Sequence, residues 1–239
     1  MASNISKPYN VDLVFCIDAT ASMTPLIDTV KKNAINFHKD LAAAMGGKNK
    51  TINQLRIRVI AFRDFIADHN DAIMATGFLT LPRDMDLFVR SVNSISAFGG
   101  GDDPEDGLEA LAYAMRSKWT PTTSEAKNRQ IIVVWTDAAT HELGYGSGEP
   151  NYPESMPKTF ADLSLWWPDV SQIPEALLDF SSSRLVLFAP DEPYWSTIFN
   201  NWDNVVHFPA AAGSGLEEAT YNEILDTIVN SVVSEVKQQ

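Results

Sequence analysis

The sequence predicts an α/β protein with a doubly wound, mostly parallel central sheet, one antiparallel edge strand and helices on both faces. Three short apolar runs lack the alternation of half-exposed strands, as expected for parallel strands covered on both faces. These runs are 13–17, 131–135 and 185–189. Segments with helical spacing of apolar residues separate them. Alternation of strands and helices is typical of a doubly wound sheet.

The remaining elements follow in order along the chain. After the run 13–17, a helix is predicted over 24–47, because a Thr-Pro pair opens it, two glycines close it and apolar residues recur every three or four positions between them. A strand is predicted over 55–65, and a polar turn connects it to an antiparallel neighbour over 72–78. Further helices are predicted over 85–95, from Pro104 onwards, and over about 216–236.

The chain is predicted to form a single domain over 11–239, preceded by an N-terminal tail, 1–10. One stretch interrupts the regular alternation, because 143–168 contains three glycines and four prolines with little periodicity. We therefore expect a long loop insertion at about 141–170. Loops of this length usually have a function or are mobile.

The composition excludes several classes of function. The chain has 31 acidic and 18 basic residues, a net charge of −13, and lacks the clustered Lys and Arg that nucleic-acid binding needs. Its longest apolar run, 110–115, is far shorter than the roughly 20 residues of a membrane-spanning helix. The N-terminal tail resembles no secretory signal, so a cytoplasmic protein without membrane contact is expected. Cys16, the single cysteine, is predicted to be a buried, inert thiol.

Oxygen-bearing side chains follow the predicted strands, at the sheet edge where ligands of doubly wound proteins bind. Asp18, Thr20 and Ser22 alternate after the first strand, so their side chains are expected to face one point. Asp102 follows three glycines, whose conformational freedom permits close approach of that loop, and Asp137 follows the central strand. Carboxylates and hydroxyls suit a hard divalent cation such as Mg²⁺. Mn²⁺ and Ca²⁺ are alternatives.

The pattern Asp-x-Thr-x-Ser after the first strand, a glycine-rich loop before a helix, and Thr-Asp after a central strand resembles the von Willebrand factor type A domain. The resemblance covers about 12–236. It implies a metal-ion-dependent adhesion site in which Asp18, Thr20 and Ser22 form the first loop and Asp137 the third. It also implies that an acidic side chain of a partner protein completes the shell of the cation.

The second loop departs from the commonest pattern of this family, which has a threonine ligand where this chain has Asp102. If Asp18, Asp102 and Asp137 are all ionised, the site with a doubly charged cation bound has a net charge of about −1. Such a site should hold its metal firmly and disfavour acidic partners. Asp103 is expected to be the N-cap of the helix that follows, because Asp commonly fills that position.

Four side chains in and near the predicted long loop are candidate contacts with a partner: His141, Tyr145, Trp166 and Trp167. Exposed aromatic residues beside a metal are plausible recognition anchors. They could equally pack the loop onto the body of the domain. Phe62, Arg63 and Asp64 at the end of the second strand also resemble intracellular and bacterial members of the family, which commonly act as adaptors beside kinases, phosphatases or AAA ATPases.

Two functions fit an Asp after the first strand. The first is a protein-binding module that docks a partner through the cation and performs no chemistry of its own. The second is a Mg²⁺-dependent aspartyl phosphotransferase of the haloacid dehalogenase type, a class with the motif Asp-x-Asp-x-Thr. This chain has Thr20 where that motif has its second Asp, so the carboxylate that acts as general acid and base is absent. Because the chain also lacks nucleophile-elbow, Walker and dinucleotide-binding motifs, the binding module is predicted.

Overall fold

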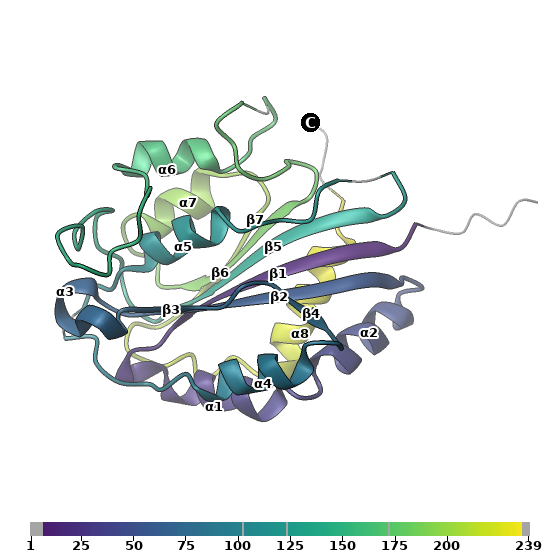
Figure 1. Ribbon diagram of the computed structural model, residues 1–239, viewed down its shortest axis with the longest axis horizontal. Helices are drawn as coiled ribbons and strands as arrows, with labels where there is room; N and C mark the ends of the chain where they lie inside the picture. The colour runs from purple at the N-terminus through teal and green to yellow at the C-terminus, as the bar shows by residue number, and fades with distance from the viewer. Residues whose placement is uncertain (1–6, 102, 123, 172, 236–239) are drawn as a thin grey trace, which may run out of the picture.

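A mostly parallel β-sheet runs through the centre of the protein (Figure 1). The computed structural model describes residues 7–101, 103–122, 124–171 and 173–235. In these residues the seven-stranded sheet has the order β3-β2-β1-β5-β6-β7, and β4 also pairs with β2. The strands are β1 (Tyr9–Asp18), β2 (Ile52–Phe62), β3 (Ile73–Ala75), β4 (Leu79–Leu81), β5 (Lys127–Trp135), β6 (Ser183–Ala189) and β7 (Val205–Pro209). The long strands pair in parallel, whereas β3 and β4 are antiparallel to β2, so the predicted sheet with an antiparallel edge is confirmed.

β1 is buried along its whole length and separates two apolar cores. Because side chains alternate across a strand, Leu13 and Phe15 enter the core on one face, and Val14 and Cys16 enter the core on the other. This burial on both faces explains why the strand reads as a continuous apolar run. Cys16 is free and buried, as predicted.

Helices cover both faces of the sheet (Figure 1). One face packs against α1 (Thr24–Asn33), α2 (Phe37–Gly47), α4 (Met85–Asn93) and α8 (Tyr221–Val233). The other face packs against α5 (Gly107–Met115), α6 (Phe160–Trp166) and α7 (Trp195–Asn201). The short helix α3 (Phe65–Asp68) and two 3₁₀ turns, Ala21–Met23 and His69–Asp71, lie in the connections. This is the doubly wound arrangement that the sequence predicts.

The helix predicted over 24–47 is two helices, α1 and α2. The break lies between Asn33 and Asn36, where Ile35 is exposed. Asn favours helix ends, because its side chain competes with the helical hydrogen bonds. Asn33 donates its side-chain amide to the main chain at Thr29, and Asn36 stands at the N-cap position of α2. The single apolar stripe along 24–47 concealed this break.

Two other helices start later than predicted. α5 begins at Gly107 and not at Pro104, because the main chain of Glu105 pairs with Thr140 in an isolated bridge and is unavailable to a helix. α8 begins at Tyr221 and not near residue 216, because Thr220 and Glu223 form a capping box there. The predicted long loop at about 141–170 contains α6, whose own capping box starts at Thr159.

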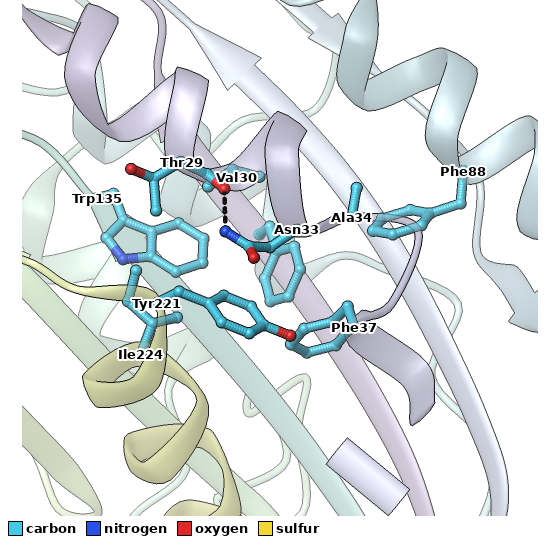
Figure 2. A pocket seen from close by; sticks show the side chains of 10 residues that line it. Thr29, Val30, Asn33, Ala34, Phe37, Phe88, Trp135, Tyr221 and Ile224 are labelled. Atoms are coloured by element: carbon cyan, nitrogen blue, oxygen red, sulfur yellow. Dashed lines mark hydrogen bonds between the residues drawn. The ribbon is translucent and has the colours of Figure 1, made fainter. Parts of the chain in front are cut away.

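A small apolar cavity lies between α1, α8 and the sheet (Figure 2). Phe15 and Trp135 of the sheet line it together with Tyr221 of α8. Its volume is about 30 Å³, which is the space of one water molecule. The polar atoms at its wall include Asn33, whose amide already bonds to Thr29. The cavity is therefore a packing gap in the core and is too small for a ligand.

Candidate functional site

Three loops meet at the carboxyl ends of β1, β2 and β5. The first loop (19–23) follows β1, the third loop (136–141) follows β5, and the glycine loop (96–101) lies between them in sequence. The carboxyl edge of a doubly wound sheet is where ligands bind in this class of fold. The predicted site residues after β1 and β5 are brought together there.

Asp18 is fully buried at the end of β1 and accepts three hydrogen bonds. Its Oδ1 accepts from the main-chain N of Thr20 at 2.9 Å and from the hydroxyl of Thr20 at 2.7 Å. Its Oδ2 accepts from the hydroxyl of Thr136 at 2.7 Å. Burial raises the pKa of Asp18 to about 6, although these hydrogen bonds act in the opposite direction. The Asp18 carboxylate is thus held in one orientation between the first loop, through Thr20, and the third loop, through Thr136.

Ser22 and Asp137 join the first loop to the third. The Ser22 hydroxyl donates to Oδ1 of Asp137 at 2.9 Å and lies 3.4 Å from the hydroxyl of Thr20. Oδ2 of Asp137 accepts from the main-chain N of Gly215 at 2.7 Å. Gly215 has a positive φ, and a Cβ there would collide with the main chain of Ser22. No role was assigned to the segment 213–215 from the sequence, because its contact with Asp137 is a long-range one.

The donor set fits a hard divalent cation in its chemistry. Two carboxylates and two hydroxyls, from Asp18, Thr20, Ser22 and Asp137, form one hydrogen-bonded group. In the described part of the chain, no three His, Cys, Asp or Glu side chains gather closely enough to hold a metal by themselves. A cation would therefore rely on hydroxyls and on water, which suits the hydrated habit of Mg²⁺. The remaining predicted ligand, Asp102, lies outside the described residues.

An open pocket of about 250 Å³ lies beside this group. Thr20, Ser22 and Asp137 line it together with Asp103, Glu105 and the three glycines 99–101. All three glycines have positive φ, as the sequence suggested. A Cβ at Gly100 would lie only 2.5 Å from Oε1 of Glu105 and 2.8 Å from Cβ of Thr20. Close approach of the glycine loop to the first loop therefore requires a residue without a side chain.

Arg63, at the end of β2, binds the loops together through main-chain carbonyl groups. Its Nε donates to Ala19 O at 2.9 Å and to Phe98 O at 3.0 Å. Its Nη2 donates to Ser96 O and its Nη1 to Asp71 O, both at 2.5 Å. The side chain is buried, and its guanidinium lies over the Phe98 ring. Arg63 thus fixes the first loop relative to the glycine loop.

A layer of buried acids lies next to the pocket at the start of α5. Burial and neighbouring carboxylates raise the pKa of Glu105 to about 10, and burial with the charge of Glu109 raises the pKa of Asp106 to about 7. Burial also raises the pKa of Glu109. Asp106 accepts from Phe65 N at 2.6 Å. The sequence predicted only a helix from Pro104 onwards, and the burial of Glu105 and Asp106 was missed.

The predicted N-cap role of Asp103 is wrong. The N-cap position of α5 is Asp106, and Oδ1 of Asp103 instead accepts from Ala139 N in the third loop at 3.0 Å. The reason is the pairing of Glu105 with Thr140, which keeps 103–106 beside the third loop instead of in a helical turn.

His141 and Tyr145 stack face to face with ring centroids 3.9 Å apart. Nε2 of His141 also lies 2.8 Å from a carboxylate oxygen of Asp64, so its imidazole is engaged inside the protein. Tyr145 is 54% exposed and remains available to a partner.

Trp166 and Trp167 occupy different environments. Trp166 is half-buried against the apolar core on the α5 side. Trp167 is 3% exposed and stacks on Trp202, and its indole N–H donates to Asp203 O. For Trp167 the structure therefore favours the packing alternative, and its predicted partner contact is corrected.

No helix within the described ranges is long and apolar enough to cross a membrane.

This fold and its loop-edge donors define an α/β domain of the doubly wound class with a candidate ligand site at the carboxyl edge. The von Willebrand factor A domain model matches residues 12–144, more than half of the chain. The chain therefore belongs to the von Willebrand factor A domain family.

Two comparisons extend this assignment. The chain is 29% identical over 147 residues to alpha-protein kinase vwkA of Dictyostelium discoideum, which covers 62% of this chain and 21% of that protein. It thus spans about a fifth of that relative. The fold is similar to the pilus adhesin SpaC from Lactobacillus rhamnosus GG, with a TM-score of 0.51, 13% identity and coverage of 95% of this chain and 32% of that chain. At this identity the likeness to SpaC concerns the fold.

Proposed function

We propose that this domain docks a partner protein through a divalent cation held by Asp18, Thr20, Ser22 and Asp137. The observation that carries the proposal is the hydrogen-bonded group of these four side chains, which joins the ends of β1 and β5. A bound cation would supply an open coordination position for an oxygen atom of the partner. The partner donor that we propose is an acidic side chain, and Mg²⁺, Mn²⁺ or Ca²⁺ is the proposed cation.

The residues of this chain would have distinct roles. Asp18 and Asp137 provide the negative charge, and both are almost completely buried. The hydroxyls of Thr20 and Ser22 now hydrogen-bond to Asp18 and Asp137, and they would turn their oxygen atoms to the cation. Arg63 and the glycine loop keep the first loop in place. Tyr145 is the exposed aromatic side chain that we propose as a contact with the partner.

Binding is favoured over catalysis. The family to which the chain belongs commonly serves protein interaction, and SpaC is named as a pilus adhesin. The relative from Dictyostelium is named as a kinase, but the matched segment is only about a fifth of that protein. The haloacid dehalogenase alternative has no support from the comparisons, and Thr20 donates to Asp18 where that enzyme class would have a second carboxylate. A cytoplasmic location remains part of the proposal.

Calorimetric titration with Mn²⁺ and Mg²⁺ tests the cation. The wild type is expected to bind one equivalent of Mn²⁺, and Asp137→Asn is expected to lose at least about tenfold in affinity because a ligand charge is removed. Asp86→Asn, which removes one exposed carboxylate on α4, is the matched control and should bind as the wild type does. Absence of saturable binding to the wild type would refute the cation.

Water-proton relaxation tests the docking step. A short peptide containing Glu should displace water from protein-bound Mn²⁺ and lower the relaxation enhancement, whereas the same peptide with Gln should do so far less. Equal effects of the two peptides would show that a carboxylate is not the donor. This outcome would leave cation binding intact and refute the proposed partner chemistry.

A further inference from the structure

A second open pocket, of about 440 Å³, lies at the edge of the sheet on the side that α5 covers. Arg58 of β2, the connection 76–78 between β3 and β4, and residues at and just after the end of α5 form its walls. It shares no described lining residue with the cation pocket. Its volume is within the range of small-molecule sites.

This second pocket has three positive side chains on its walls and no negative one among its described lining residues. The cations are Arg58, Arg116 and Lys118, and we call the cavity that they line the basic pocket. They are three of only 18 Lys and Arg residues in a chain with a net charge of −13. None of them forms an ion pair with a described carboxylate. Because unpaired cations repel one another, an anion among them would be stabilised.

Arg58 differs in its pairing from Arg56, which lies two positions earlier on the same face of β2. β1 places Asp12 opposite Arg56, and the two side chains form a bidentate ion pair with N–O distances of 2.7 and 2.6 Å. Opposite Arg58, β1 has Val14, which carries no charge. The sheet therefore supplies a counterion for Arg56 and leaves Arg58 without one.

Neutral groups hold Arg58 in place. Its Nε donates to Thr76 O at 2.9 Å, and its Nη1 donates to Tyr113 O at 3.1 Å and to Ser117 Oγ at 2.7 Å. The guanidinium also lies over the Tyr113 ring, 4.6 Å from its centroid, and the guanidinium of Arg116 lies over the same ring at 5.2 Å. Burial lowers the pKa of Arg58, and the charge of Arg116 acts in the same direction. Arg58 is thus fixed in orientation while its charge stays uncompensated.

The other two cations keep donors for a ligand. Arg116 donates through Nη1 to the main-chain O of Glu154 and of Ser155, and its Nε and Nη2 make no hydrogen bond to a described residue. Lys118 is exposed, and its ammonium group makes no hydrogen bond within the described part of the chain either. The basic pocket therefore has one fixed and two adaptable cationic groups.

We infer that the basic pocket binds a phosphate monoester, whose phosphoryl group contacts Arg58, Arg116 and Lys118. A phosphoryl group carries a charge of about −1.5 to −2 near pH 7 and three strong acceptor oxygens, so it can engage three cations, whereas a carboxylate has one charge and two oxygens. Arginine also binds phosphate through two parallel hydrogen bonds. The organic part of the ligand would pack against the rings of Phe78 and Tyr113, which line the same pocket. This binding does not depend on the proposed cation.

Calorimetric titration with phenyl phosphate in metal-free buffer tests the site. Phenyl phosphate supplies a phosphoryl group and an aromatic ring, and phenyl sulfate has the same shape with a single negative charge. The wild type is expected to bind one equivalent of phenyl phosphate, and to bind phenyl sulfate about tenfold more weakly or less.

A double variant at the two adaptable cations shows where the ligand binds. Arg58 is left unchanged because its hydrogen bonds also support the fold. Arg116→Gln combined with Lys118→Gln is expected to weaken phenyl phosphate binding about tenfold or more, because two charged donors are lost. Arg90→Gln combined with Lys32→Gln removes the same charge from exposed positions on α4 and α1 and should bind within about twofold of the wild type. Circular dichroism confirms that both double variants are folded.

A peptide that contains phosphotyrosine distinguishes two sources of the phosphate monoester. Tighter binding of this peptide than of phenyl phosphate supports a phosphorylated partner protein, and binding no tighter than that of phenyl phosphate supports a small organic phosphate. Three results would overturn the inference: no saturable binding of phenyl phosphate to the wild type, equal binding of phenyl sulfate and phenyl phosphate, or equal affinities of the two double variants. Because no metal is present in these titrations, none of these results bears on the proposed docking through a cation.

Discussion

The hydroxyl of Ser22 donates a hydrogen bond of 2.9 Å to Oδ1 of Asp137, across 115 positions of the sequence. This bond connects the loop after β1 to the loop after β5, two strands that lie side by side in the sheet. Because Asp137 also accepts from Gly215, the same carboxylate holds three separate segments together. The candidate site is therefore ordered by its own donors before any ligand binds.

Ser22→Ala separates the two roles of this hydroxyl. Without a cation, loss of the hydrogen bond to Asp137 should lower the free energy of unfolding by about 1 kcal/mol. With saturating Mn²⁺ the difference in the free energy of unfolding between the variant and the wild type should be larger, because the variant also lacks a proposed ligand of the cation. Urea unfolding with and without Mn²⁺ measures both effects. An identical gap in the two conditions would argue against Ser22 as a ligand.

Arg63→Lys should destabilise the protein although it keeps the charge. Arg63 donates to four main-chain carbonyl groups, and a Lys ammonium cannot reproduce this planar set of donors. We expect a loss of about 2 kcal/mol or more in the free energy of urea unfolding. Arg83→Lys, on the exposed surface, is the control and should change the stability little. A neutral effect of Arg63→Lys would mean that the loops are held by other contacts.

Gly100→Ala should disrupt the glycine loop. The residue has a φ of +90°, and a Cβ would lie 2.5 Å from the Glu105 carboxylate. We expect a destabilisation of roughly 1–3 kcal/mol and a weaker affinity for Mn²⁺. Gly46→Ala is the opposite case, because no atom lies within 4 Å of its added Cβ and the residue is in α2. Thermal unfolding should show stabilisation there, by about 0.5–1 kcal/mol.

Asp106 should make the cation-free protein less stable as the pH rises. Its pKa is raised from 3.8 to about 7, so the native state holds a proton that the unfolded chain releases between these values. More protons bound to the native state mean that stability decreases with rising pH across this window, and the loss levels off above about pH 7. Asp106→Asn should reduce the difference between unfolding free energies at about pH 5 and about pH 8 by a few kcal/mol. Measurement in the presence of a chelator tests this, and an unchanged pH profile would contradict it.

Much of the sheet could be predicted from the sequence, because strands buried on both faces leave unbroken apolar runs. β1, β5 and β6 were found in this way. β4 and β7 were missed, because β4 has three residues and the five residues of β7 are not fully buried. The break between α1 and α2 was also missed, because one apolar stripe continues through Asn33 and Asn36. Periodicity reports which face is buried and does not report where a helix bends.

For the site, the sequence predicted residues that follow strands, because the carboxyl ends of parallel strands meet. Asp18, Thr20, Ser22 and Asp137 lie together for this reason. Glu105 and the segment at 213–215 were not predicted as parts of the site. Their positions depend on long-range pairing, with Ala139 for Glu105 and with Asp137 for Gly215. No local pattern of residues encodes such pairing.

A crystal structure of the protein grown with Mn²⁺ tests the cation site most directly. Anomalous scattering at the manganese edge should give one strong peak in the pocket, about 2.1 Å from the Ser22 and Thr20 hydroxyl oxygens. A peak elsewhere on the surface, or no peak at saturating Mn²⁺, would contradict the proposal that this domain docks its partner through a cation.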